Sequence, residues 1–408
     1  MAFITSIKRT IAFATTAALA ASSMFAVEWG GLVGGDGKFY NNSEKFKGGD
    51  NPTIEATADA SLWLRIPFSA SGENYLITEG KYEFEHDHNI DGRDESDNTQ
   101  YLDLSLFKLV FLKHLSTGDS AKEISLSLGR FYLSDLSGKI FTQNADGLLA
   151  KYNSTFLGLS LYGSYTGLLN GRAVSMLSCE DEDTYHEDND KFYEFAERYV
   201  VGSVSASLNN LFLNQTLCIE GLGTFRAEGE SYNRMYGTLS ISGPAFANTY
   251  YSVSSTLGYT AYDGDDDKIK TGVGNMTTGR IAYFTSFKDA TFGLSGLFAS
   301  DKFTGFTSNT AIQAQNEEQV SGILLAGPFG TIKPTESVLV NASAEIACDS
   351  HRGDEKDSFG LAGMQFKGGI AYQPFSDLSL KFSAVQFIDF DESENNKTTL
   401  ELAAALTF

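Results

Sequence analysis

The stretch IEATADASLWLRIPF, residues 54 to 68, decides the fold of this 408-residue chain. Its even-numbered side chains are all apolar, whereas the odd-numbered set includes Glu55, Asp59 and Arg65. Successive side chains of a β-strand point to opposite faces, so such a strand separates an oily medium from a wet one. A membrane-crossing strand needs roughly 9–11 residues, and this alternation is longer. We therefore predict a strand with one face toward lipid and a charged face toward water.

The same alternation recurs along the chain. Between Leu76 and Phe84 the inward set is Ile77, Glu79, Lys81 and Glu83, and near the C-terminus Lys367 lies opposite an apolar face that includes Phe366 and Ile370. Charges at every second position need water or each other. A water-filled lumen supplies both.

The pattern divides the chain into eighteen expected strands. They cover 27–40, 54–68, 73–86, 100–114, 121–133, 147–154, 156–167, 195–208, 211–225, 233–243, 248–262, 269–286, 290–300, 317–327, 336–347, 358–372, 377–388 and 398–408. Connections after even-numbered strands are mostly short, and those after odd-numbered strands are mostly longer and charged, as in outer-membrane barrels. The joint from Gly327 to Thr335 is too long and contains two prolines, so sixteen strands is the alternative count. The expected fold is an all-β, transmembrane, antiparallel up-and-down barrel of 16–18 strands.

Residues 1–26 are predicted to be a cleaved secretory signal peptide, which leaves 27–408 as the barrel. Lys8 and Arg9 precede an apolar stretch that ends near Ala21, and cleavage sites of small residues follow at Ala20 or Ala26. An uncleaved anchor helix is the alternative, but the apolar core is short for a membrane span. The chain is therefore expected to leave the cytoplasm.

The formal charge of −22 is concentrated in the expected long connections. Five of them carry a net −18: 87–99, 168–194, 263–268, 348–357 and 389–397. So negative a protein repels polyphosphate, which argues against a nucleic-acid partner. Three cysteines cannot form a disulfide scaffold, and they supply no zinc-binding pair, so we expect neither a metal nor a cofactor. Cys179 and Cys348 fall in outer loops, where oxidising conditions permit a bridge, whereas Cys218 lies mid-strand.

The signal peptide, the alternating strands and the terminal strand TTLELAAALTF resemble bacterial outer-membrane β-barrels of the porin kind. In that family the terminal aromatic and the alternate apolar residues before it are recognised by the barrel-assembly machinery. The matching positions here are Leu402, Ala404, Leu406 and Phe408. The resemblance implies an integral protein in outer-membrane lipid, and it allows a homotrimer. The first strand, VEWGGLVGGDGKFY, also resembles outer-membrane proteins of spirochaetes.

A second local similarity surrounds Arg130, in GRFYLSDLSGKIFTQNADG at 129–147. Porins often place an arginine on the strand before a loop that folds into the lumen and narrows it. Here the loop from Ser134 to Asp146 is short for that task. Strict alternation puts Arg130 on the apolar face, unless a bulge at Gly129 turns it inward. Arg130 is therefore either a lumen-facing residue of the constriction or a rim residue beside lipid head groups.

The expected function is a channel for passive diffusion of small hydrophilic solutes, because barrels of 16–18 strands enclose water. The pore-lining candidates are Glu55, Asp59, Arg65, Glu79, Lys81, Glu83, Arg130 and Lys367, and the same alternation also assigns Asp103, Lys381 and Glu401 to the lumen. Their acidic excess favours cations mildly or gives little selectivity. The alternative for each residue is a structural ion pair that stiffens the wall.

Two other functions compete with the channel. A surface-exposed adhesin would use the barrel only to display acidic loops such as 168–194. An enzyme would need more than the sequence offers: His86, Asp87 and His88 form an acid–base grouping without a nucleophile, so we expect no enzymatic activity. The acidic run Asp263 to Asp267 lacks the spacing of a calcium-binding loop and predicts no specific metal site.

Overall fold

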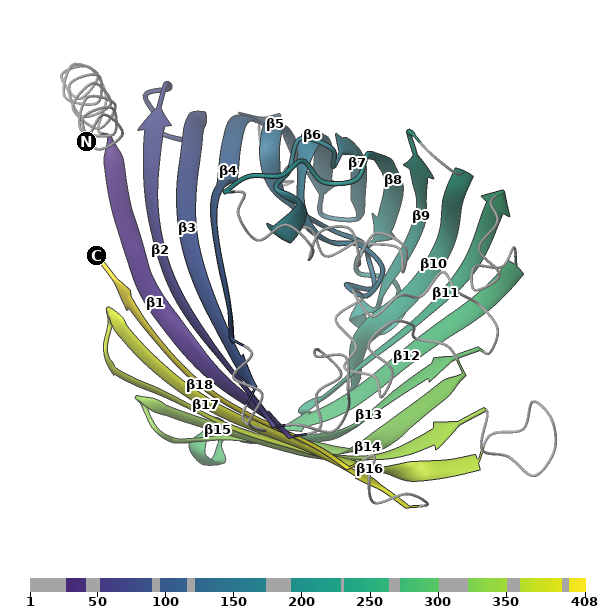
Figure 1. Cartoon of the computed structure of the whole chain (residues 1–408). Coiled ribbons are helices and arrows are strands. Elements are labelled where there is room, and N and C mark those ends of the chain that lie inside the picture. Colours follow the sequence, from purple (N-terminus) through teal and green to yellow (C-terminus); the bar gives the residue numbers. More distant parts are fainter. Residues whose placement is uncertain are drawn as a thin grey trace.

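A computed structural model describes residues 27–41, 52–89, 96–115, 122–173, 192–228, 231–263, 272–300, 322–350, 360–390 and 396–408. Eighteen antiparallel strands make up one sheet in these ranges (Figure 1). They are β1 Glu28–Asn41, β2 Thr53–Pro67, β3 Tyr75–Asn89, β4 Ser96–His114, β5 Lys122–Ser134, β6 Thr142–Ser154, β7 Leu157–Tyr165, β8 Tyr199–Leu208, β9 Thr216–Arg226, β10 Ser231–Phe246, β11 Thr249–Asp263, β12 Gly272–Phe284, β13 Thr291–Ala299, β14 Ile323–Thr335, β15 Val338–Asp349, β16 Gly360–Phe375, β17 Leu378–Asp389 and β18 Lys397–Thr407. The expected signal peptide, 1–26, lies outside the described residues.

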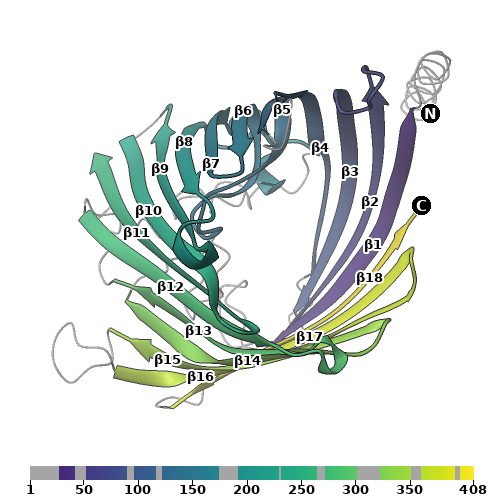
Figure 2. The same ribbon diagram turned by 180° about the vertical axis from the view of Figure 1, so that it is seen from behind.

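The sheet closes on itself, because β1 pairs with β2 on one side and with β18 on the other. Each of the remaining strands pairs with the strand before it and the strand after it in the chain, as an up-and-down barrel requires (Figure 2). The last residue takes part in the closure: the Gly31 amide donates to the Phe408 carbonyl (3.0 Å), and the Phe408 amide donates to the Gly31 carbonyl (3.1 Å). Closure leaves no unpaired sheet edge at the two chain ends.

The exposure of side chains in β2 follows the expected period of two. Ile54, Ala56, Ala58, Ala60 and Leu62 are exposed on the outer face, whereas the residues between them are buried or half-buried. Elsewhere the outward set is again apolar, as at Leu102, Val204 and Leu402. The outer surface is therefore of the kind that lipid tails contact.

The count of eighteen strands is confirmed, but the expected joint from Gly327 to Thr335 is wrong. β14 runs through this stretch, and the turn to β15 consists of residues 336–337. The two prolines fit because each lies where the ladder to β15 is interrupted: Pro328 where the pairing lapses between Ala326 and Phe329, and Pro334 within a register shift before Thr335. A missing backbone N–H costs little at such a position.

A second joint also differs from the expectation. The turn expected at Asn209 and Asn210 extends to Gln215, so that β9 begins five residues later than predicted. Asn210, Leu213 and Asn214 all have positive φ angles, and a short 3-10 helix, η2 (Phe212–Asn214), forms in the turn. Backbone in this left-handed region cannot continue a strand.

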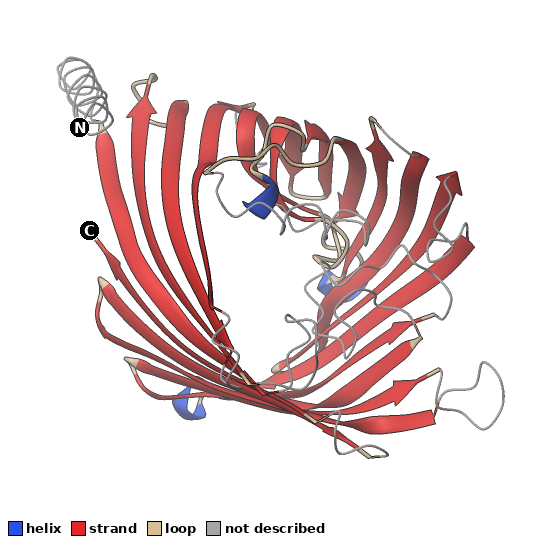
Figure 3. Cartoon of the chain, in the orientation of Figure 1, coloured by secondary structure: helices blue, strands red, loops and turns tan. Residues whose placement is uncertain are grey.

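Buried apolar side chains gather inside the barrel, around β5, the β5–β6 connection and the chain between β7 and β8. This cluster contains Phe131, Leu133, Ile140, Phe141, Ala145, Tyr162, Leu169, Ala196, Tyr199, Val201, Leu222, Tyr236, Met276 and Ala299. Figure 3 shows strand throughout the wall, with only short helices in the connections. Among the described residues, no helix is long and apolar enough to cross a membrane.

Candidate functional site: a constriction inside the barrel

The β5–β6 connection, residues 135–141, is a compact loop organised by one carboxylate. Asp135 is buried, and it accepts hydrogen bonds from the backbone amides of Ser137 (2.8 Å), Lys139 (3.1 Å), Ile140 (2.9 Å) and Phe141 (2.9 Å). An aspartate that begins a turn and bonds to following amides is a common way to fix a tight loop. We refer to residues 135–141 as the inward loop.

The inward loop is attached to a distant strand. The Leu136 amide donates to Oε2 of Glu220 on β9 at 2.5 Å, and the other carboxylate oxygen accepts from Ser203 Oγ on β8 at 2.5 Å. Ile140 and Phe141 belong to the same buried cluster as Leu222 of β9 and Met276 of β12. Since β5 and β9 are four strands apart, the loop turns inward across the lumen and does not extend away from the barrel end.

Lys139 is the basic residue of the inward loop. Burial lowers the pKa of its ammonium group, and the positive charge of Lys367 lowers it further, while Asp135 and Glu345 act in the opposite direction. Lys367 on β16 forms an ion pair with Glu345 on β15 at 3.3 Å. The inward loop therefore carries a lysine within electrostatic range of the wall formed by β15 and β16, and the loop itself occupies part of the lumen.

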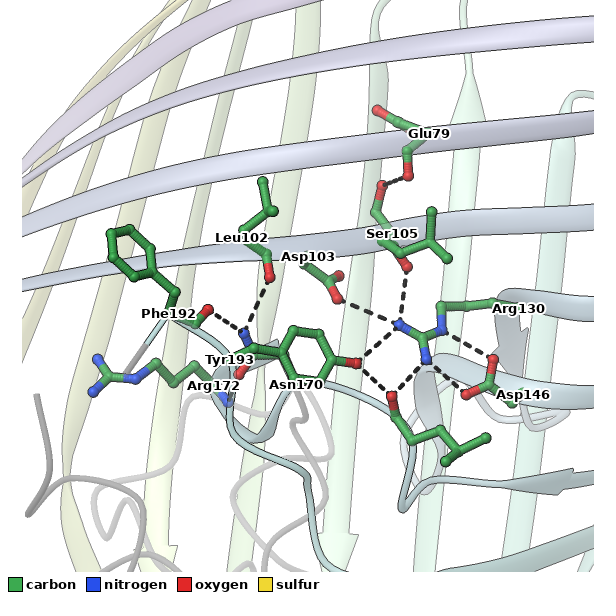
Figure 4. A network of polar contacts seen from close by, with 12 residues as sticks. Glu79, Leu102, Asp103, Ser105, Arg130, Asp146, Asn170, Arg172, Phe192 and Tyr193 are labelled. Carbon is green, nitrogen blue, oxygen red and sulfur yellow. Dashed lines mark hydrogen bonds and ion pairs between the residues drawn. The ribbon is translucent and has the colours of Figure 1, made fainter. Parts of the chain in front are cut away.

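Arg130 lies at the root of the inward loop and is almost fully buried, with 6% of its surface exposed. Its Nε and Nη2 atoms donate to the two carboxylate oxygens of Asp146 at 2.9 and 2.8 Å (Figure 4). Nη1 contacts the Asp103 carboxylate (3.5 Å) and the Leu104 carbonyl (3.1 Å), and Nη2 also donates to the Leu168 carbonyl (2.7 Å). The guanidinium thus lies inside the barrel but is covered by protein.

Gly129 determines how Arg130 is aimed. Its φ angle is +111°, and a Cβ at this position would lie 2.1 Å from the carbonyl oxygen of Phe107. Only glycine meets both conditions without strain. The backbone irregularity here takes Arg130 off the apolar face to which strict alternation would assign it.

The other pore-lining candidates lie along the wall formed by β1, β2 and β3. Glu55 accepts from Lys38 Nζ at 2.8 Å and from the Tyr40 hydroxyl at 3.3 Å. Lys81 forms an ion pair with Glu83 on its own strand. These ion pairs are compatible with both roles predicted from the sequence, which are charges that line the lumen and structural ion pairs that stiffen the wall.

Three further candidates are placed near the turn end and the middle of the same wall. Arg65 forms an ion pair with Glu28 at 2.8 Å and donates to the Gly72 carbonyl at 2.7 Å, close to the β2–β3 turn. Asp59 lies opposite Gly34 of β1 and Glu79 opposite Trp63 of β2 in the ladder. Their role in lining a pore remains a prediction.

The four residues of the expected assembly signal all lie on the outer face of the last strand. Leu402, Ala404, Leu406 and Phe408 are exposed there, on the lipid side of β18. Recognition by an assembly machinery also remains a prediction.

Metal-binding geometry is limited to one group among the described residues. Carboxylate oxygens of Glu55, Glu85 and Asp87 lie within 4.8 Å of one another. Glu55 already pairs with Lys38, which supplies the positive charge. His86, from the grouping considered for acid–base chemistry, contacts Asn98 at 2.9 Å. Cys218 and Cys348 are free thiols, and Cys179 and the acidic stretch 264–271 lie outside the described ranges.

Sequence reasoning missed the residues that build the constriction. Asp135 had a usable signal, because Asp-x-Ser-Gly at 135–138 is turn chemistry. Glu220 had a weaker one, a lone acid in a strand whose other charged residue is Arg226 at its end. Asn170 and Tyr193 carry no pattern at all, since the contact of Asn170 with Leu102 and that of Tyr193 with Arg130 join residues more than sixty positions apart.

Comparison with solved structures shows the fold shared with other barrels. OccK7 (OpdD) of Pseudomonas aeruginosa superposes with a TM-score of 0.60 at 10% identity, covering 94% of this chain and 99% of that chain. OccAB2 of Acinetobacter baumannii superposes with a TM-score of 0.59 at 7% identity, covering 93% of this chain and 98% of that chain. The outer membrane protein OpdK of P. aeruginosa superposes with a TM-score of 0.56 at 10% identity, covering 93% of this chain and 99% of that chain. No protein-family model and no curated protein matches the sequence. The fold is that of an integral outer-membrane β-barrel of the porin type.

Proposed function

We propose that the chain forms a water-filled channel through which small hydrophilic solutes diffuse passively across an outer membrane. The observation that carries the proposal is the inward loop: a closed eighteen-stranded barrel contains a folded loop that is bonded to Glu220 of β9, with Lys139 within electrostatic range of Lys367 and Glu345. A barrel of this size has room for an aqueous pore. A constriction with charged walls sets which solutes pass.

The channel is weakly selective, with a mild preference for cations. The wall formed by β1 to β4 supports this preference, because its acidic residues, which include Glu55, Asp59 and Asp103, outnumber its basic ones, which include Lys38, Lys81 and Lys108. Carboxylates on a pore wall attract cations. The lysine of the inward loop opposes this field, so the preference is small.

The test is a planar-bilayer recording of the refolded full-length mature protein. We expect stepwise conductance, and a reversal potential in a KCl gradient whose sign shows that K⁺ is slightly more permeant than Cl⁻. Insertion into the bilayer without any conductance steps would refute the channel and favour the adhesin. Stepwise conductance with a clear chloride preference would refute only the cation preference.

A further inference from the structure

The chain between β7 and β8 contains a two-stranded extension that leaves the wall. Beyond β7 and before β8, the Ala196 amide donates to the Leu169 carbonyl (3.0 Å), and the Gly171 amide donates to the Glu194 carbonyl (2.7 Å). Figure 3 shows the extension as a loop-coloured segment that crosses from β8 toward β4, with a short helix, η1 (Gly171–Ala173), at its side. We call the described parts of it, residues 166–173 and 192–198, the strap.

The strap ends against an open edge of β4. β4 pairs with β5 only from Phe107 to His114, so its first half, Ser96 to Leu106, has no β5 partner in the ladder. The strap provides a backbone partner at one point of this edge: the Leu102 amide donates to the Phe192 carbonyl at 3.1 Å. An unpaired strand edge in a membrane barrel is costly, so this contact stabilises the wall as well as the strap.

Three polar side chains hold the strap on that edge. Asn170 is fully buried, and its Nδ2 donates to the carbonyls of Leu102 (3.4 Å) and Phe192 (3.3 Å). The Tyr193 hydroxyl donates to the Leu168 carbonyl and lies 3.5 Å from Nη1 of Arg130. Arg130 in turn donates to Leu168 on the strap and to Leu104 on β4 (Figure 4). Arg130 therefore joins the strap, β4 and β6 at one point.

The strap also covers the inward loop. Leu169 and Ala196 of the strap belong to the buried cluster that contains Ile140 and Phe141 of the loop. The apolar contacts hold the loop and the strap together, whereas the polar contacts that hold the strap on β4 are concentrated at Arg130, Asn170 and Tyr193. Loss of these few polar contacts would free the strap from β4, while the inward loop would still be held by its own bond to Glu220 and by its apolar contacts.

We propose that the strap is a latch for the constriction. With Asn170, Tyr193 and Arg130 engaged on β4, the strap stays beside the inward loop and the channel is narrow. With these contacts broken, the strap leaves β4, the inward loop stays bonded to Glu220, and the channel widens on the β4 side. Arg130 is thus a positioning residue that acts through the strap, and solutes do not contact it. The proposal rests on the proposed channel function.

The first test compares Asn170→Ala and Tyr193→Phe with Tyr132→Phe, a control tyrosine on β5 whose side chain is 61% exposed. Removing one partner of a buried hydrogen bond costs about 1.4 kcal/mol, so each latch variant raises the ratio of wide to narrow openings about tenfold. The control leaves the ratio unchanged. Latch variants with the wild-type ratio, in barrels that migrate as folded on unheated gels, would overturn the proposal.

The second test locks the strap on β4 with an engineered disulfide. Leu102→Cys with Phe192→Cys, in a chain whose three native cysteines are replaced by serine, places two thiols where the backbones are hydrogen-bonded. We expect an intramolecular disulfide on a gel, which requires no channel activity, and a narrow channel whose wide openings return only after reduction. Failure to cross-link, or wide openings in the oxidised channel, would overturn the latch. A wild-type protein that does not conduct would instead refute the proposed function, and the cross-link would still report on the strap.

Discussion

Arg130 and Asp146 form a two-point ion pair across β5 and β6, with donor–acceptor distances of 2.9 and 2.8 Å. They are directly opposed in the ladder. Such fork-to-carboxylate pairs add geometric precision to their electrostatic attraction. The pair lies where the hairpin of the inward loop leaves the wall and where the strap is held.

Arg130→Gln should destabilise the barrel strongly, because it leaves Asp146 and the buried Asp103 without their positive partner. Breaking a buried pair from one side typically costs about 3–5 kcal/mol. The measurement is urea unfolding of the refolded barrel in detergent, followed by tryptophan fluorescence. Arg198→Gln is the matched control, since Arg198 pairs with Glu228 at the surface. Its effect should stay below about 1 kcal/mol. Equal losses in the two variants would contradict a buried role for Arg130.

Gly129→Ala should impair folding, although it adds a single methyl group. The φ angle of +111° is strained for alanine, and the new Cβ would meet the Phe107 carbonyl oxygen at 2.1 Å. A strained backbone of this kind costs about 1–3 kcal/mol before the clash is counted. Gly163→Ala on β7 is the control, because nothing lies within 4 Å of its added Cβ. Refolding yield on unheated gels should fall for the first variant alone; equal yields would show that the irregularity at Gly129 is dispensable.

Lys139→Gln should increase the preference for cations, because it removes the positive charge carried by the inward loop. The reversal potential in a KCl gradient measures this change. Lys288→Gln is the control, since Lys288 lies in the β12–β13 turn and donates to the Pro334 carbonyl. A shift of equal size in both variants would mean that overall charge, and not the constriction, sets the selectivity.

The wild-type channel should also become more cation-selective as the pH is raised. The pKa of Lys139 is lowered by burial and by Lys367, so the protonated form is disfavoured and its charge is lost at a lower pH than for a free lysine. The same recordings over an alkaline pH series detect the transition. It should be absent from Lys139→Gln, and a transition that persists in that variant would have to be assigned to another group.

Phe408→Ala should reduce assembly in cells more than it reduces folding in detergent. The backbone of Phe408 completes the β1–β18 closure through Gly31, and that contact survives the substitution, whereas the exposed ring does not. Folded protein in outer-membrane fractions, compared with refolding in vitro, separates the two effects. Phe375→Ala, an exposed aromatic at the end of β16, is the control. Normal membrane levels of the Phe408 variant would remove the basis for an assembly signal.

The barrel could be predicted from sequence because the residues of each strand show which of its faces contacts lipid and which contacts water. In β2 the lipid face is apolar at every second residue, and this local rule reveals strands, their number and their closure without knowledge of any long-range contact. The prediction was wrong at Gly327 to Thr335 because prolines usually end strands. Here the hydrogen-bond ladder to β15 is interrupted at both prolines. Such an interruption depends on how two strands pair, so the sequence of one strand does not reveal it.

The constriction was accessible only in part. Alternation predicted the sheet face of charged residues such as Lys367, and the sequence around Arg130 raised a lumen-facing role as one of two possibilities. The burial of Arg130 by a strap, and the attachment of Leu136 to Glu220, join residues 38 to 84 positions apart. No local pattern encodes such pairs.

The sequence by itself determined that this chain is a closed barrel with a polar interior. The alternation of apolar and polar residues along each strand indicates which medium each side chain contacts. Only the tertiary structure decided what fills that interior. The inward loop and the strap are held by buried hydrogen bonds and an apolar cluster between distant segments. Those contacts exist only once eighteen strands have brought β4, β6 and β9 around one lumen.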